Sequence, residues 1–85
     1  MNLSIQANLS TQKIDGELVI LDKGNGQIHQ LNSVASFIWQ HIEDGLDISV
    51  ITKQLVESFD IDELTAKTDL DKILQQFEEL KLINI

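Results

Sequence analysis

Residues 26–39 read GQIHQLNSVASFIW, and the hydrophobic period changes within this stretch. Up to Leu31 the residues suit a short extended strand, whereas after Asn32 the apolar side chains recur every three or four positions, as they do on a helix. The side chain of Asn32 or of Ser33 can cap that helix by accepting a hydrogen bond from a free backbone amide. The stretch therefore predicts a strand, Gln27 to Leu31, that leads directly into a helix.

Two further strands are predicted upstream of this one. Apolar residues alternate within residues 3–14, and the apolar run at residues 17–22 suits a strand that is buried on both faces. Asp15-Gly16 stands between them and is a favoured dipeptide for a tight hairpin turn. Residues 27–31 are more polar than residues 17–22, as expected of an edge strand. We expect a three-stranded antiparallel sheet with residues 27–31 at its edge.

Three helices are predicted downstream, at about residues 33–44, 47–59 and 62–81. Gly45 is placed to end the first helix, and Asp47 and Asp62 are placed to cap the other two. The third helix has the longest apolar stripe, made up of Ala66, Leu70, Ile73, Leu74, Phe77 and Leu80. An apolar tail follows and is expected to fold back on the core; it contains Leu82, Ile83 and Ile85. The whole chain, residues 1–85, reads as a single α+β domain with the layout of a winged helix-turn-helix.

Composition excludes several classes of protein. The 85 residues suffice for one domain with a modest core, and the absence of cysteine excludes disulfides and thiolate metal sites. The net charge of −8, from 14 acidic and 6 basic residues, disfavours binding to nucleic acid and to anionic lipid. No signal peptide is visible, and no apolar run approaches the length of about 20 residues that spans a bilayer. We expect a cytoplasmic protein.

No constellation of residues for catalysis or for metal binding is visible. The two histidines, His29 and His41, fall on different predicted elements. The acidic residues between positions 44 and 63 do not have the spacing of a calcium-binding EF-hand loop. Gly24-Asn25-Gly26 lacks the lysine and the helix start of a phosphate-binding loop. The sequence therefore predicts a protein without enzyme activity, metal or cofactor.

DNA binding remains an alternative because the winged-helix layout permits it. A recognition helix must bring arginine or lysine to phosphates and base edges. The chain contains no arginine, and the lysines of the second and third helices stand among at least as many acids: Lys53, Lys67, Lys72 and Lys81. The chemistry disfavours a DNA-binding protein, while a regulatory adaptor or a dimerisation module stays open.

Peptide binding is the function that the predicted surface favours. A sheet edge offers free N–H and C=O groups to an extended segment, and pockets beside it add selectivity. On the third helix, Leu74 lies on a flank beside Lys67, Asp71 and Glu78, where it can belong to the core periphery or line a groove. Trp39 offers a similar choice between the core and contact with a partner.

An ordered series of short motifs runs along the chain: ELVILD at residues 17–22, Gly26, Leu31-Asn32, Phe37-Ile38-Trp39, Asp44-Gly45, Asp69-Leu70, Ile73-Leu74, Phe77 and Leu82-Ile83. In order and spacing the series resembles the PqqD family, and the resemblance covers roughly residues 9–83. It implies three strands before three helices. It also implies a peptide chaperone, known as a RiPP recognition element, which binds the leader of a ribosomally synthesised and post-translationally modified peptide.

The resemblance further implies where the leader binds. The leader would add as an antiparallel strand to Gln27, Ile28, His29, Gln30 and Leu31. The helix wall of the groove would draw on Lys67, Leu70, Asp71 and Leu74. The chaperone would present the precursor to a modifying enzyme, such as a radical S-adenosylmethionine enzyme or a leader peptidase, and a homodimer is also open. Lys81 stands where the family commonly has glycine, so the third helix is expected to run on or to end differently.

Overall fold

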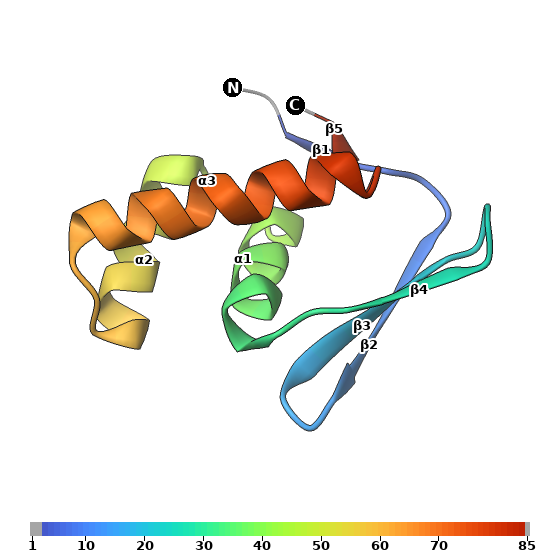
Figure 1. The fold of residues 1–85 in the computed structure, drawn as a ribbon, viewed down its shortest axis with the longest axis horizontal. Helices are drawn as coiled ribbons and strands as arrows, with labels where there is room; N and C mark the ends of the chain where they lie inside the picture. The colour runs from blue at the N-terminus through green and yellow to red at the C-terminus, as the bar shows by residue number, and fades with distance from the viewer. Residues whose placement is uncertain (1–2, 85) are drawn as a thin grey trace.

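The computed structural model describes residues 3–84 (Figure 1). The predicted sheet is present and antiparallel, in the order β2 (Leu9–Ile14), β3 (Glu17–Asp22), β4 (Gln27–Gln30). The helices are α1 (Ser33–Glu43), α2 (Ile48–Phe59) and α3 (Glu63–Glu79). Two short strands, β1 (Ser4–Ile5) and β5 (Ile83–Asn84), pair with each other in a separate sheet near the chain ends. The predicted α+β fold, with three strands before three helices, is confirmed.

The first hairpin turns at Asp15-Gly16, as predicted. Both residues have positive φ, 51° and 82°, and Ile14 pairs with Glu17 across the turn. A two-residue loop with both φ angles positive matches the right-handed twist of the flanking strands. The turn therefore fixes the register between β2 and β3.

Side-chain caps start two of the helices. The Oδ1 atom of Asn32 accepts a hydrogen bond from the amide of Ala35 at 2.8 Å, so Asn32 rather than Ser33 caps α1. Asp62 caps α3 in the same way. Asp47 occupies the cap position of α2, but its carboxylate accepts from the hydroxyl of Ser49 at 2.7 Å and makes no side-chain cap bond to the helix backbone.

The third helix ends at Glu79, two residues before the predicted end. Lys81 has a φ of 61°, in the left-handed region. Its amide donates to the carbonyl of Glu78, and the amide of Leu82 donates to the carbonyl of Phe77, both at 2.9 Å. These two bonds form a Schellman motif, which satisfies the last helical carbonyls. Glycine would adopt this conformation without strain, whereas lysine adopts it at a cost.

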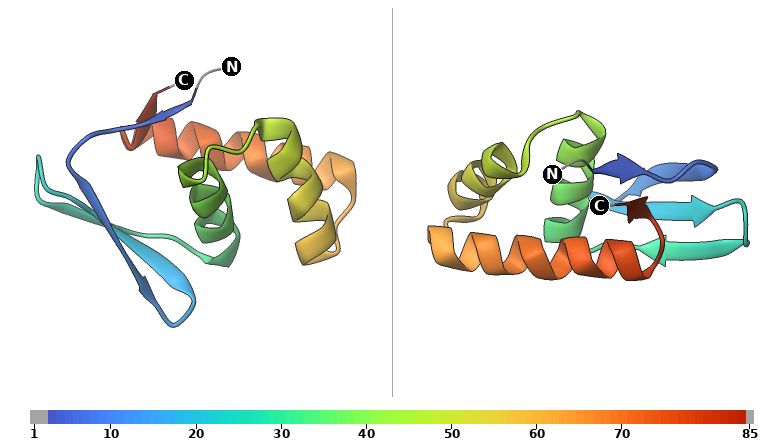
Figure 2. Two further views of the ribbon diagram at one scale, coloured as in Figure 1. Left: turned by 180° about the vertical axis from the view of Figure 1, so that it is seen from behind. Right: turned by 90° about the horizontal axis from the view of Figure 1, so that it is seen from above.

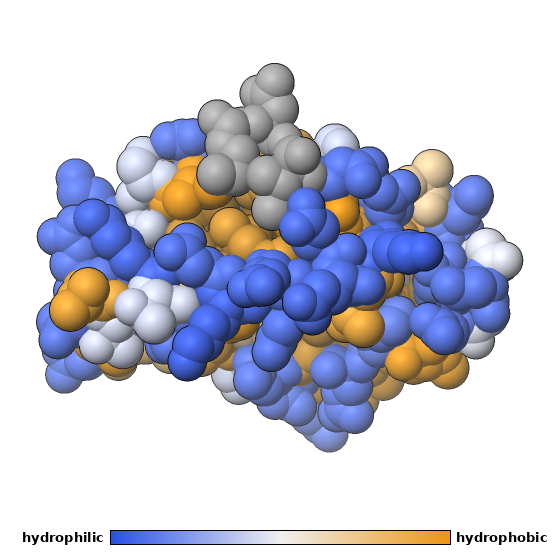
Figure 3. All heavy atoms as spheres, turned by 45° about the horizontal axis from the view of Figure 1, so that its top comes forward, coloured by the Kyte–Doolittle hydropathy of each residue, from blue (hydrophilic) through white to orange (hydrophobic). Residues whose placement is uncertain are grey.

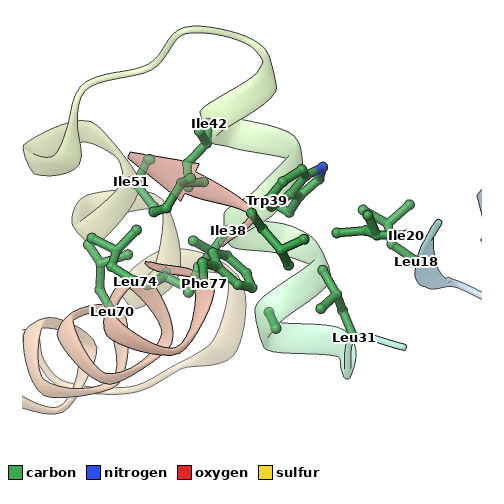
Figure 4. Packing of buried hydrophobic residues seen from close by; sticks show 14 of the residues in the cluster. Leu18, Ile20, Leu31, Ile38, Trp39, Ile42, Ile51, Leu70, Leu74 and Phe77 are labelled. Atoms are coloured by element: carbon green, nitrogen blue, oxygen red, sulfur yellow. The ribbon is translucent and has the colours of Figure 1, made fainter. Parts of the chain in front are cut away.

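The core lies between the helices and one face of the sheet (Figure 4). Trp39 and Phe77 pack edge to face with ring centroids 5.3 Å apart, so Trp39 belongs to the core. Leu82 and Ile83 are also buried, which confirms for these two residues that the tail folds back; Ile85 lies outside the described residues. The buried cluster contains Leu18, Ile20, Leu31, Ala35, Ile38, Trp39, Ile42, Ile51, Leu55, Ala66, Leu70, Leu74, Phe77, Leu82 and Ile83.

Only one face of β3 is buried. Leu18 and Ile20 point into the core, whereas Val19 is half-buried and Leu21 is 37% exposed. The prediction that this strand is buried on both faces is wrong. The helices lie on one side of the sheet (Figure 1), so the alternate side chains of β3 face solvent.

Candidate peptide-binding site at the edge of the sheet

Strand β4 is an edge of the three-stranded sheet and lies on the side nearer to α3, whereas β2 lies on the far side (Figure 2). The amide of Leu31 donates to the carbonyl of Leu18 at 2.8 Å. This bond shows which residues of β4 turn their backbone N–H and C=O groups toward β3. Because backbone groups alternate along an antiparallel strand, those of His29 point to β3. The N–H and C=O groups of Ile28 and Gln30 then point away from the sheet. Among residues 3–84, no further strand pairs with this edge, so these groups are available to one from another chain.

A serine of α1 holds the end of this edge strand. Ser36 is buried, and its Oγ accepts from the amide of Leu18 at 2.9 Å and donates to the carbonyl of Leu31 at 3.2 Å. The hydroxyl thus stands where the two backbone groups would otherwise meet directly in the ladder. Ser36 carries no motif that indicates this role. The sequence shows only a small polar residue three positions before Trp39, on the apolar side of the helix.

The side chains of β4 alternate between the two faces of the sheet. Ile28 is 69% exposed on the outer face, while Leu31 is buried at 6% and anchors the strand to the core. His29 is half-buried on the core face, and its Nε2 atom is buried without a hydrogen-bond partner among residues 3–84. Gln27 and Gln30 are exposed. Of the predicted peptide-binding residues on the strand, Leu31 therefore supports the edge, and the others are at least partly accessible.

The residues predicted on α3 do not form one surface toward β4. Leu70 and Leu74 are buried at 1% and 5%, so Leu74 belongs to the core. Lys67 and Asp71 line a hollow of about 670 Å³ between α2 and α3, and the Lys67 Nζ lies 3.4 Å from a carboxylate oxygen of Glu63. Figure 3 shows the hydrophilic outer face of α3 with apolar surface beside it. The lining of the hollow comprises Ile48, Ser49, Val50, Thr52, Lys53, Val56, Glu63, Lys67, Leu70 and Asp71.

The opposite flank of α3 carries Asp69, Ile73 and Gln76. Helical geometry places these residues across the buried stripe from Lys67 and Asp71, the two residues that line the hollow beside α2. Asp69 and Ile73 are half-buried, and Gln76 is exposed. Because α2 lies on the other flank, this flank is the one that remains for a groove beside the free edge of β4.

Comparison with known proteins identifies the family. The family model described as coenzyme PQQ synthesis protein D (PqqD) matches residues 17–83. The chain belongs to the PqqD family. No curated protein matches the chain.

Two solved structures share the PqqD-like fold of this chain. TbiB1, solved in complex with the TbiA(beta) leader peptide, is 26% identical, has a TM-score of 0.89 and is matched over 94% of this chain and 93% of its own. Lasso peptide synthetase B1, complexed with the leader peptide, is 22% identical with a TM-score of 0.90, over 98% of each chain. At the lower identity the likeness concerns the fold alone.

The departure from the PqqD pattern at Lys81 does not lengthen the helix. Lys81 takes the left-handed conformation, which glycine adopts without strain, and α3 ends there in hydrogen bonds from Lys81 and Leu82. Of the two expectations, running on or ending differently, the first is wrong. The chain then leads into β5, which contacts α3 and whose Ile83 is buried.

The sequence did not show which flank of α3 lies beside α2. The apolar stripe of a helix shows which side is buried, but not which of its two flanks meets which neighbour. That choice depends on where α2 lies, and α2 occupies the side of Lys67 and Asp71. Asp69 is half-buried on the other flank, and its position on a helical wheel, next to the apolar stripe, is a signal that the sequence contains.

Among residues 3–84, no three histidine, aspartate or glutamate side chains are grouped so that they could hold a metal ion. In the same part of the chain, none of the helices has the length and apolar character needed to cross a membrane.

Proposed function

We propose that this protein is a non-catalytic peptide chaperone that binds the leader of a precursor peptide by strand addition to β4. The proposal rests mainly on the backbone of Ile28 and Gln30. Their N–H and C=O groups point away from β3, at a sheet edge that lies beside α3. Membership of the PqqD family supports it. The complex of TbiB1 with a leader peptide, at 26% identity over most of both chains, supports it further.

Strand addition would use both the backbone and the side chains of the edge. An antiparallel leader strand would exchange hydrogen bonds with Ile28 and Gln30, and these bonds give affinity with little sequence preference. Alternate leader side chains would point toward α3, where Ile73 offers apolar contact and Asp69 offers a carboxylate. The net charge of −8 would steer a basic leader toward the protein.

We assign the binding residues in two groups. Gln27, Ile28, His29 and Gln30 would contact the leader strand, and Leu31 would hold that edge in place. On α3, Leu70 and Leu74 would act by packing that fixes the helix. The contact surface would comprise Asp69, Ile73 and Gln76, rather than Lys67 and Asp71.

Presentation to a modifying enzyme is the second part of the proposal. A bound leader that occupies only the edge of β4 and one flank of α3 would leave the outer surfaces of α1 and α2 accessible. A radical S-adenosylmethionine enzyme or a leader peptidase could then contact the complex while the core of the precursor extends beyond the chaperone. The chaperone itself would supply no catalytic group.

The first test is a titration of isotopically labelled protein with the synthetic leader of a candidate precursor peptide, monitored by amide chemical shifts. Shifts are expected for residues 27–31 and for the flank of Asp69 and Ile73. A scrambled leader of the same composition is the control. Shifts confined to the hollow between α2 and α3, around Lys53 and Lys67, would contradict the proposed site.

A proline substitution tests the hydrogen bonding itself. In Ile28→Pro the lost N–H is the one that points away from β3, so the β3–β4 ladder keeps its bonds and the domain should stay folded. Leader affinity should fall by about tenfold or more, because the bound strand loses a donor and the edge is distorted. Ile28→Thr also loses the apolar side chain but keeps the N–H, so the loss of affinity in Ile28→Pro beyond that in Ile28→Thr measures the backbone contribution. Equal affinity for Ile28→Pro and the original protein would count against strand addition.

A further inference from the structure

The outer face of the sheet carries an apolar pair at its free edge. Leu21 and Ile28 are opposite each other in the β3–β4 register, and they are 37% and 69% exposed. Their alternation with Ile20 and His29 places both on the face away from the helices. Large aliphatic side chains at adjacent exposed positions leave apolar area in water that a further neighbour would remove.

The row across the sheet shows on which side that neighbour belongs. In register, Ser10 of β2 stands opposite Leu21, which stands opposite Ile28. The row is polar at the β2 end and becomes apolar and more exposed toward the β4 edge. The neighbouring row, Gln12–Val19–Gln30, has polar residues at both ends. A partner that covered the whole face would meet the polar side chains of β2, whereas a strand added beside β4 would meet only the apolar end of the first row.

The outward direction of the Ile28 backbone groups places one residue of such a strand directly beside Ile28. Because the N–H and C=O groups of Ile28 point outward, the residue opposite it in an added antiparallel strand forms a hydrogen-bonded pair with it. Directly opposite residues project their side chains on the same face. The side chain of that peptide residue therefore lies on the outer face, next to Ile28 and in line with Leu21.

We infer that the peptide bound by this protein carries valine, isoleucine or an aromatic residue opposite Ile28, so that this residue, Ile28 and Leu21 form one apolar cross-strand row. The inference rests on the proposed strand addition. Side chains on both faces of the peptide strand would contact the protein: those on one face would contact α3, and those on the other would contact this row. The residue opposite Gln30, two positions along, would be polar.

The experiment uses peptides selected from a displayed library of random 12-residue sequences on the immobilised protein. The register of a selected peptide is read from nuclear Overhauser contacts to Ile28. Ile28→Thr and a threonine substitution at the opposing peptide residue then form a double-mutant cycle. Each single change should weaken binding up to about fivefold, and the double change should weaken it by less than the product of the two.

The matched control is Ile14→Thr. Ile14 is also a large apolar residue on the outer face, 50% exposed, but it lies on β2 away from the free edge. Peptide affinity should not change in this variant. Thermal unfolding of both threonine variants checks that the domain is intact.

The outcomes separate this inference from the proposed function. If peptides add to β4 but show polar residues opposite Ile28, or no coupling in the cycle, the inference is overturned and strand addition stands. If no selected peptide contacts the backbone of Ile28 and Gln30, both fall. If sedimentation shows a dimer that Ile28→Thr dissociates, and peptides do not couple to Ile28, a second copy of the chain is the neighbour and the inference is overturned.

Discussion

Replacing Ser36 by alanine should destabilise the domain through the end of the edge strand. The substitution removes the hydroxyl that accepts from the amide of Leu18 and donates to the carbonyl of Leu31. Ser36, Leu18 and Leu31 are all buried, so water does not readily replace the hydroxyl. A buried backbone group without a partner costs about 1–3 kcal/mol. If the strands close so that the two groups meet directly, only about 0.5–1.5 kcal/mol is lost.

We therefore expect the free energy of unfolding to fall by about 2 kcal/mol in Ser36→Ala, between these two limits. Urea unfolding followed by tryptophan fluorescence measures it, because Trp39 is the sole tryptophan and is buried against Phe77. With a urea dependence of about 1 kcal/mol per molar for a domain of this size, the midpoint should fall by about 2 M.

Ser58→Ala is the matched control. Ser58 is an exposed serine of α2, and its replacement should change stability by no more than about 0.5 kcal/mol. Amide exchange at Leu18 and Leu31 should also become faster in Ser36→Ala than in the control. A loss below about 0.5 kcal/mol, with exchange unchanged, would refute the role assigned to the hydroxyl.

Three further predictions concern the C-terminal end of α3, the Asp62 cap at its start and the DNA-binding alternative. Lys81→Gly should raise the free energy of unfolding by about 0.5–1 kcal/mol, measured by urea unfolding, because glycine adopts the left-handed conformation without strain; a loss of stability would contradict this. The hydrogen bond from the Thr65 amide to Asp62 lowers the pKa of Asp62 below its ordinary value of 3.8. The Asp62 carboxylate therefore stabilises the fold above pH 3.8, and this stabilisation is lost as the pH falls through the lowered pKa. Asp62→Asn should flatten the acid side of the plot of urea midpoint against pH, and an unchanged profile would show that Asp62 does not contribute. Finally, the protein should show no salt-dependent retention on heparin or duplex DNA, and a mobility shift that weakens with salt would instead support the DNA-binding alternative.

Local sequence patterns predicted most of the fold. The change of period at Leu31-Asn32 located the end of β4 and the start of α1, and the Asn32 side chain forms the cap that this position allows. Asp15-Gly16 predicted its turn because both residues tolerate positive φ. These features depend on residues within a few positions of one another. A short stretch of sequence is therefore enough to predict them.

Features that depend on distant neighbours could not be predicted in the same way. Whether Leu21 is buried depends on whether any element covers the outer face of the sheet, and the run ELVILD looks the same in either case. The flank of α3 that faces β4 depends on the position of α2. The bond network of Ser36 joins residues 18 positions apart, with no periodicity to mark it. Gln27 to Leu31 could be proposed as a binding edge from the sequence, whereas the flank of Asp69 and Ile73 could be proposed only with the structure.

The most direct test of strand addition is amide hydrogen exchange at the edge of β4. Exchange at Ile28 and Gln30 should be fast in the free protein, because their N–H groups point away from β3. With a saturating leader or library-selected peptide, exchange at these two amides should slow selectively, while the exposed amides of the α2 surface keep their rates. Fast exchange at both amides in a protein saturated with peptide would contradict the account.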